Sequence, residues 1–251
     1  MPKPDSTHRF SDRVENYVNY RPSYPAEAIA YLQNRAIAPT STVADIGSGT
    51  GIMTQLLLPH CQAIFAVEPN AAMRSKAEAD LGHMAGFQSR SGTAEATGLE
   101  ANSVDAIVCA QAYHWFDSEA TLQEFRRIVR GPRMLFLVWN DRTTKTPFLV
   151  HYEALLKEFG TDYTEVNHQR ITDAQLRPIF AAQYEKKEFD NEQRLDLYGV
   201  KGRLNSTSYV PKPGDPRYEM LMRGVEEAFA QHSENGEVKI LYSTTIYSGK
   251  I

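Results

Sequence analysis

The sequence predicts an α/β fold in which a mostly parallel sheet is doubly wound, with helices on both of its faces. Short apolar runs alternate with helical patterns through the first 140 residues, and a glycine-rich turn at 47–51 (G-S-G-T-G) joins the first run to a helix. With 251 residues and 42% hydrophobic content, the chain is long enough for one large domain, or for a domain with a cap.

Five strands and four helices are expected in the first part of the chain. The predicted strands are 42–46, 62–67, 87–91, 104–110 and 134–139. The predicted helices are 25–34, 52–58, 70–81 and 119–129. The alternation is typical of strands joined by crossover helices.

The last part of the chain adds two strands and several helices. Strands are expected at 183–189 and 238–247, and the second alternates well enough to belong to an edge pair. Helical patterns cover 147–159, 172–180, 195–209 and 216–232. We therefore expect a single domain, 1–251, in two parts. Its core is about 25–142 plus C-terminal strands at about 183–190 and 237–248, and its helical cover is about 145–235 plus the N-terminal segment 8–24.

The glycine-rich turn predicts a ligand of nucleotide type. Asp45 lies near the end of the first strand, and the glycines allow backbone angles that a Cβ forbids. Free N–H groups at the start of the following helix favour an anionic group. The sixth place of a G-x-G-x-x-G dinucleotide fingerprint holds Ile52, and the Lys of a P-loop is absent, so the turn alone does not identify the ligand.

An acid follows the second strand at the spacing that ribose binding requires. Glu68 stands about 20 residues after the glycines, where a carboxylate can accept hydrogen bonds from both ribose hydroxyls. The alternative is a surface acid at a strand end, which position and spacing together disfavour.

Four segments together resemble class I S-adenosylmethionine-dependent methyltransferases. They are 45–51, 67–69 (V-E-P), 92–95 (G-T-A-E) and 111–116 (Q-A-Y-H-W-F). The segment 17–25 (Y-V-N-Y-R-P-S-Y-P) further resembles a small-molecule, type 11-like subgroup related to trans-aconitate and ubiquinone-biosynthesis methyltransferases. The resemblance is close over roughly residues 10–140 and loose over the remainder.

The resemblance implies a Rossmann-like, doubly wound, seven-stranded sheet that ends with one antiparallel strand, and S-adenosyl-L-methionine as the cofactor. Asp45, Gly47 and Gly51 would lie near its methionine portion, Glu68 would hold the ribose, and 93–95 would border the adenine. Many relatives carry Asp in place of Thr93, so which of these three residues contacts the adenine stays open. The full predicted cofactor-binding set is Tyr17, Arg21, Asp45, Gly47, Ser48, Gly49, Gly51, Glu68, Pro69, Met73, Thr93, Ala94, Glu95, Ala110 and Gln111.

His114 is the candidate for a general base, since the unperturbed pKa of histidine lies near neutrality. It is equally well interpreted as a structural histidine in the cleft wall. A carboxylate acceptor would need no base, whereas a hydroxyl or carbon acid would. The substrate wall is predicted to contain Tyr24, Tyr113, His114, Trp115 and Tyr209. The other histidines show no pairing that indicates a metal site.

Net charge and cysteine spacing limit the kinds of partner and metal site that we expect for this protein. A formal charge of −4 shows no electrostatic footprint for nucleic acid, and the arginines at 126, 127, 130 and 133 lie around a helix end, where cations favour the dipole. Cys61 and Cys109 have no metal-ligand spacing and read as buried thiols. With no signal peptide or membrane-spanning run recognised, we expect a cytoplasmic enzyme that acts on a small molecule, with no membrane or nucleic-acid partner.

Two other functions stay open at this stage. A binding module could hold S-adenosylmethionine or S-adenosylhomocysteine without turnover, because no residue is an obligatory catalyst. An NAD(P)-dependent oxidoreductase is disfavoured by Ile52 in the sixth fingerprint place and by the 92–95 and 111–116 segments.

Overall fold

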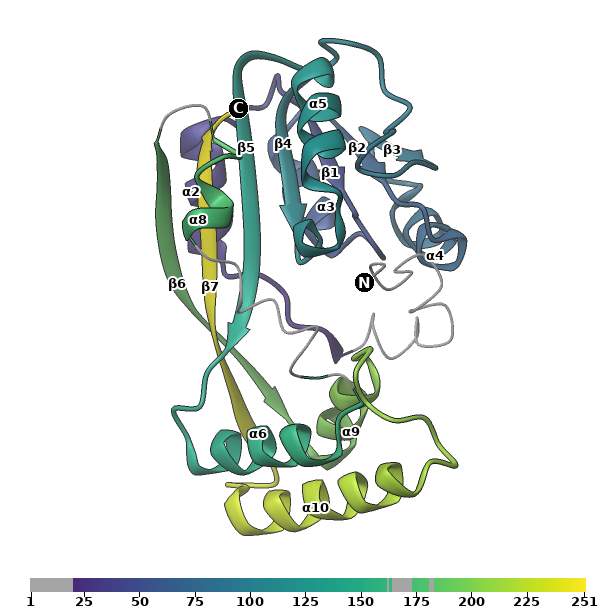
Figure 1. The fold of residues 1–251 in the computed structure, drawn as a ribbon, viewed down its shortest axis with the longest axis vertical. Coiled ribbons are helices and arrows are strands. Elements are labelled where there is room, and N and C mark those ends of the chain that lie inside the picture. Colours follow the sequence, from purple (N-terminus) through teal and green to yellow (C-terminus); the bar gives the residue numbers. More distant parts are fainter. Residues whose placement is uncertain (1–19, 162, 164–172, 181–182) are drawn as a thin grey trace.

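The computed structural model describes residues 20–161, 163, 173–180 and 183–251. Its centre is a seven-stranded sheet with the order β3-β2-β1-β4-β5-β7-β6 (Figure 1). The chain therefore winds outward from β1 in one direction and from β4 in the other, which confirms the predicted doubly wound sheet. Ligands of such sheets bind beyond the carboxyl ends of the strands where the order reverses. Here that point lies between β1 and β4.

The first five strands are mutually parallel. They are β1 (Thr42–Ile46), β2 (Ala63–Val67), β3 (Phe87–Arg90), β4 (Val104–Ala110) and β5 (Val129–Arg142). All five predicted strands are present, but β5 extends beyond 134–139 at both ends. Its last three residues are polar, so the sequence pattern does not mark them as part of a strand. They belong to β5 because they pair with β7.

Two long strands complete the sheet. β7 (Val238–Lys250) runs antiparallel to β5 on one side and to β6 (Tyr184–Leu195) on the other. The prediction that the first of these strands ends near 189 or 190 is wrong, because β6 continues to Leu195, which pairs with Val238. β6 is an edge strand with mostly exposed, charged residues, so its second half lacks the apolar alternation that marks a strand.

The helices of the core match the predicted ones to within one residue at each end. They are α2 (Ala26–Arg35), α3 (Ile52–Leu57) with the 3₁₀ turn η1 (Leu58–His60), α4 (Ala71–Leu81) and α5 (Ser118–Ile128), preceded by the 3₁₀ turn η2 (Tyr113–Trp115). Side chains cap two of them: Asn70 accepts from the Met73 amide, and Asp117 accepts from the amides of Glu119 and Ala120. These caps fix where the loops after β2 and β4 end.

Helices cover both faces of the sheet (Figure 1). α2 and α3 pack with Phe136 in one apolar cluster, while α5 packs with Leu135 and Leu137 in another. The alternation of these three neighbouring residues between the two clusters reflects the two-residue period of a strand that is buried on both faces.

A second group of helices lies beyond the carboxyl ends of β4 and β5 (Figure 1). It consists of α6 (Pro147–Phe159), α9 (Leu197–Asn205) and α10 (Pro216–His232), which share an apolar cluster with the first residues of β7. We call these three helices the cover. The short helix α8 (Asp173–Leu176) differs from the expected 172–180 helix and from the expected cover, because Leu176 and Phe180 pack in the cluster of α5.

Candidate functional site

The glycine turn after β1 has a backbone that only glycine adopts easily. Gly47, Gly49 and Gly51 have φ angles of 71°, 58° and 87°. A Cβ on Gly47 would lie 2.6 Å from Ala112 Cβ, and one on Gly51 would lie 2.6 Å from Leu81 Cδ1. The turn is thus packed tightly against the loop after β4 and against α4.

Asp45 lies in the last part of β1, just before this turn, as a fully buried carboxylate. Its Oδ2 accepts a hydrogen bond of 2.6 Å from the Thr54 hydroxyl, whereas its Oδ1 has no partner among the described residues. Burial raises the pKa of Asp45 to about 6, the Thr54 bond opposes that rise, and the nearby Glu68 charge adds to it. Ser48 and Thr50 also bury hydroxyl oxygens that no described group bonds. Unsatisfied polar atoms at one turn mark a place for a polar ligand.

Glu68 ties the end of β2 to the glycine turn. Its Oε2 accepts from the Gly49 amide at 2.9 Å, and its Oε1 accepts from the Asn70 amide at 2.7 Å. Burial raises the pKa of Glu68, and the two amides act against that rise. Each carboxylate oxygen has a second lone pair, so both remain able to accept from ribose hydroxyls. Pro69 follows directly, and the Met73 sulfur would lie 3.6 Å from a Cβ on Gly49.

The loop after β3 places the three candidates for adenine contact differently. Glu95 is engaged with α5, where its Oε1 accepts from the Asp117 amide at 2.9 Å and from the Thr121 hydroxyl at 3.4 Å. Thr93 is exposed and its hydroxyl accepts from the Ala96 amide at 3.2 Å. Ala94 is buried between them.

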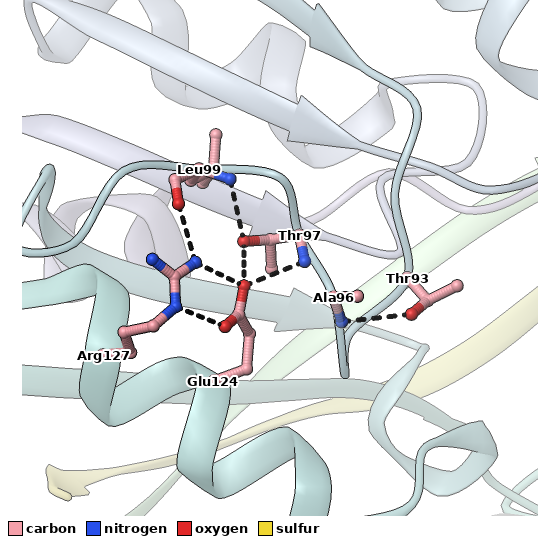
Figure 2. A network of polar contacts seen from close by, with 6 residues as sticks. All are labelled: Thr93, Ala96, Thr97, Leu99, Glu124 and Arg127. Atoms are coloured by element: carbon pink, nitrogen blue, oxygen red, sulfur yellow. Dashed lines mark hydrogen bonds and ion pairs between the residues drawn. The ribbon is translucent and has the colours of Figure 1, made fainter.

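A polar network that sequence reasoning missed anchors this loop to α5 (Figure 2). Glu124 accepts from the Thr97 amide at 2.9 Å and from its hydroxyl at 2.5 Å, and the Arg127 side chain donates to Glu124 and, at 2.6 Å, to the Leu99 carbonyl. The Arg127 guanidinium, with smaller help from Thr97, lowers the pKa of Glu124 to about 2 against the opposing effect of burial. The only sequence signal was the Glu–Arg spacing of three on a helix.

Replacing Glu124 with glutamine is expected to lower the free energy of unfolding by about 2 kcal/mol at neutral pH, through the loss of charged hydrogen bonds. Because the folded-state pKa is depressed, the stability that Glu124 contributes, at most roughly 3 kcal/mol, is present above pH 4.5 and lost as the pH falls toward 2. Urea denaturation between pH 3 and pH 8 measures both effects. The exposed Glu227→Gln is the control, and equal stability of the two variants at pH 7 would contradict the anchoring role.

The segment after β4 turns sharply at Gln111, whose φ is 58°. Ala110 ends the strand, and Tyr113 is buried in the η2 turn. His114 is half-buried; its Nδ1 lies 3.5 Å from Trp139 Nε1, which donates to it. The ring of Trp115 lies 4.8 Å from that of His114. The structure therefore brings these residues together at the carboxyl end of β4, next to the glycine turn that Ala112 contacts.

The remaining candidates are Tyr17, Arg21, Tyr24 and Tyr209, and the described ones do not lie together. Tyr17 lies outside the described residues. Arg21 Nη2 donates to the Ser206 carbonyl at 3.1 Å, which joins the segment before α2 to the end of α9. Tyr24 packs in the apolar cluster of α2 and α3, whereas Tyr209, between α9 and α10, packs against the apolar cluster of the cover, with its ring 4.8 Å from that of Tyr163. The structure thus does not place these two tyrosines in one wall.

Two absences hold for the part of the chain that is described. No group of three or more histidine, cysteine or acidic side chains is arranged to hold a metal ion. None of the helices there combines the length and apolar character needed to cross a membrane. The thiols are free, with Cys109 buried and Cys61 half-buried.

Comparison with known proteins identifies the family. The sequence profile described as "Methyltransferase domain" matches residues 44–135. An uncharacterized methyltransferase-like protein of Schizosaccharomyces pombe is 30% identical over 247 residues, which cover 96% of this chain and 94% of that one. An uncharacterized methyltransferase of Mycobacterium tuberculosis is 38% identical over 138 residues, so the match spans 55% of this chain and about half, 54%, of that relative.

Solved structures show the same fold. A protein described as a type II methyltransferase from Anaeromyxobacter dehalogenans matches with a TM-score of 0.66 and 21% identity, over 92% of this chain and 98% of that one. One described as a methyltransferase of an antibiotic biosynthesis pathway from Anabaena variabilis matches with a TM-score of 0.63 and 20% identity, over 94% and 100%. The matching sequence profile and the near full-length relative at 30% identity agree, and the chain belongs to the methyltransferase family.

Proposed function

We propose that this protein transfers a methyl group from S-adenosylmethionine to a small-molecule acceptor. The observation that carries the proposal is the buried acidic pair beside the glycine turn. Asp45 holds an oxygen with no partner among the described residues, and Glu68, which accepts from the Gly49 amide of the turn, holds two oxygens with spare lone pairs. A ligand with an ammonium group and a ribose supplies the donors that this pair needs.

Each part of the cofactor has a candidate partner. Asp45 Oδ1 would accept from the ammonium group, Glu68 from the ribose hydroxyls, and Arg21 would meet the carboxylate through a charge-assisted bond. For the adenine we favour the buried Ala94, because the Glu95 carboxylate is already bonded to α5 and the Thr93 hydroxyl to the Ala96 amide. The tightly anchored loop in Figure 2 would then hold the adenine in a fixed place.

When bound, the cofactor supplies an electrophilic methyl group on a sulfonium. What the protein then contributes is positioning and exclusion of water, since in-line displacement neutralises the sulfonium charge. The segment from Gln111 to Trp115 and the cover helices are the candidates for holding the acceptor. With Nδ1 accepting from Trp139, a neutral His114 carries its proton on Nε2, and we propose that it donates a hydrogen bond to the acceptor from there.

Replacing His114 with alanine is expected to leave the affinity for S-adenosylhomocysteine within about twofold and to lower turnover roughly tenfold or more, the range for losing one positioned hydrogen-bond group. His114→Gln separates the two roles, because an amide donates a hydrogen bond but does not take up a proton. Rescue of turnover by glutamine supports a donor. A turnover defect shared by both variants, together with loss of the acidic limb of the pH–rate profile, would assign a base.

Titration calorimetry with S-adenosylmethionine, S-adenosylhomocysteine and NADH tests the proposed cofactor. Saturable binding of the two sulfur ligands without binding of NADH supports the proposal. Binding of NADH alone would overturn it in favour of an oxidoreductase. Incorporation of labelled methyl groups into an acceptor panel then separates an enzyme from a binding module that holds the cofactor without turnover.

A further inference from the structure

Residues 20–23 lead into α2, and we call them segment 20–23. The backbone is irregular from Arg21 to Pro25, and the segment passes between the sheet and helix α9 (Figure 1). Main-chain carbonyl groups outside helices and strands need other hydrogen-bond partners when they lie inside a protein. Two carbonyls of the segment, those of Tyr20 and Ser23, obtain such partners from side chains that are far away in the sequence.

Three side-chain amides donate to these two carbonyls. Gln193 Nε2 donates to the Tyr20 carbonyl at 3.0 Å. Asn191 Nδ2 and Asn140 Nδ2 donate to the Ser23 carbonyl at 2.8 and 3.1 Å. Asn140 belongs to β5, and the other two belong to the second half of β6, two residues apart and therefore on one face of that strand. The part of β6 that lacks apolar alternation thus carries donors for segment 20–23.

The oxygen atoms of two of these amides are also hydrogen-bonded. The Oδ1 atom of the buried Asn140 accepts from the Thr244 hydroxyl at 2.5 Å and from Asn191 Nδ2 at 3.3 Å. Gln193 Oε1 accepts from the Tyr242 hydroxyl at 3.3 Å. The oxygen and the NH₂ group of an amide share one carbon, so a bonded oxygen fixes where the N–H groups point. These two amides are therefore preorganised to donate to the segment.

Helix α9 contacts segment 20–23 from the other side. The ring of Tyr20 lies against Gly202, where an added Cβ would come within 2.3 Å of two ring carbons. The Tyr198 ring meets the Tyr20 ring edge-on, with centroids 6.0 Å apart and an interplanar angle of 75°. Arg21 Nη2 donates to the carbonyl of Ser206, which caps the helix. Only glycine at 202 leaves room for the Tyr20 ring, so the segment and α9 fit each other closely.

Asn140 connects segment 20–23 to the candidate site. While its side chain donates to Ser23, its main-chain carbonyl accepts from Gln111 Nε2 at 3.4 Å. Gln111 directly follows β4, at the edge where a doubly wound sheet binds its ligand. The segment therefore lies beside the edge at which the proposed function places the cofactor.

We propose, resting on the proposed methyl transfer, that Asn140, Asn191 and Gln193 are positioning residues that hold segment 20–23 over the bound cofactor and slow its release. All three donate to main-chain carbonyls, so they fix the path of the backbone and keep Arg21 at the methionine end of the cofactor. Loss of a donor lets the segment move away more often, and the cofactor then exchanges faster with solvent. The three amides act through the segment and are not catalytic residues.

The first test replaces two of the donors by acids of the same shape. Gln193→Glu keeps an oxygen for the Tyr242 hydroxyl but loses the N–H group that bonds Tyr20, and Asn191→Asp likewise loses its N–H donors. Surface plasmon resonance on the full chain measures the dissociation rate of S-adenosylhomocysteine. We expect each variant to release it about two- to tenfold faster than the wild type, the range for one lost hydrogen bond. The matched control, Gln231→Glu at an exposed position of α10, should keep the wild-type rate.

A second test leaves every amide in place. Gly202→Ala puts a methyl group where the Tyr20 ring lies, so it should displace the ring and speed the release of S-adenosylhomocysteine by a similar factor. Tyr20→Ala removes the ring and with it the clash. Adding Gly202→Ala to Tyr20→Ala should therefore change the dissociation rate by less than about twofold. A further large increase on that background would show that position 202 acts without the segment, against the proposal.

Hydrogen exchange of the segment's own amides, measured without ligand, distinguishes the holding of segment 20–23 from general stability. In Gln193→Glu and Asn191→Asp we expect faster exchange in the segment and unchanged exchange in β1 and β4. Faster exchange together with faster release supports the proposal. Wild-type release rates in these variants would overturn it, whether or not they melt at a lower temperature. If the wild-type chain does not bind S-adenosylhomocysteine at all, the proposed methyl transfer fails, whereas unchanged rates in a chain that does bind it reject only the role of these residues.

Discussion

Asp45→Asn is expected to stabilise the ligand-free protein at neutral pH while weakening its binding of S-adenosylmethionine. The folded-state pKa of about 6 lies above the ordinary 3.8, so ionised Asp45 destabilises the fold as the pH rises from about 4 through 6. Removing that charge should raise the free energy of unfolding at pH 7.5 by up to about 3 kcal/mol. The gain should vanish near pH 4, where the wild-type carboxyl is protonated.

The same substitution removes the charged acceptor proposed for the ammonium group of the cofactor. Affinity should fall by roughly tenfold to a hundredfold, the equivalent of about 1.5–3 kcal/mol. Denaturant unfolding of the free protein and calorimetry with S-adenosylmethionine measure the two effects, with the exposed Asp190→Asn as the matched control. A variant that is less stable at pH 7.5 yet binds with full affinity would show that Asp45 is a structural residue.

Glu68→Ala should both loosen the glycine turn and reduce cofactor affinity. The substitution removes the hydrogen-bond acceptor of the Gly49 and Asn70 amides, which in the wild-type chain donate to the carboxylate at 2.9 and 2.7 Å. Each lost acceptor costs about 1–3 kcal/mol, so the two together predict a loss of about 2–6 kcal/mol of stability. Cofactor affinity should drop by at least a further 1–3 kcal/mol if the carboxylate also holds the ribose.

Separating these two roles of Glu68 requires a milder change. Glu68→Gln retains one oxygen acceptor, so its stability should lie between those of the wild type and the alanine variant. Binding of S-adenosylhomocysteine and of its 2′-deoxyribose analogue is then compared by calorimetry. If Glu68 binds the ribose, the wild type should favour the hydroxylated ligand and the variant should lose much of that preference. If the wild type and the variant show the same preference for the hydroxylated ligand, Glu68 does not bind the ribose and only stabilises the turn.

The core elements of the fold could be read from the sequence because their signals are local. The β1 strand and its glycine turn, and the apolar runs of β2 and β4, each lie within a few residues. Asp45 and Glu68 could be expected near the same turn, because neighbouring parallel strands place their carboxyl ends at the same edge of the sheet. The second half of strand β6 was not predicted, because charged residues on an edge strand hide the period of two.

The sequence indicates candidate site residues well where a suitable residue type stands at a strand end. It indicates them less well where tertiary packing determines whether a side chain is exposed to a ligand. The three residues 93–95 are equivalent in the sequence, yet the structure buries Ala94, exposes Thr93 and bonds Glu95 to α5. Tyr24 resembles Tyr209 as a candidate for a substrate wall, yet the two lie in separate apolar clusters. Burial of one side chain depends on the rest of the fold and cannot be read from its neighbours in the sequence.

The sequence by itself determined the doubly wound sheet, the glycine turn and the acids at the ends of β1 and β2. Periodicity, backbone freedom and strand-end position are properties of short segments. Only the tertiary structure decided that Glu124 bonds to a loop 27 residues away and that Arg203 donates to a tyrosine 39 residues away. Such partners meet only after the chain has packed, because the free energy of a buried charge depends on what surrounds it in space.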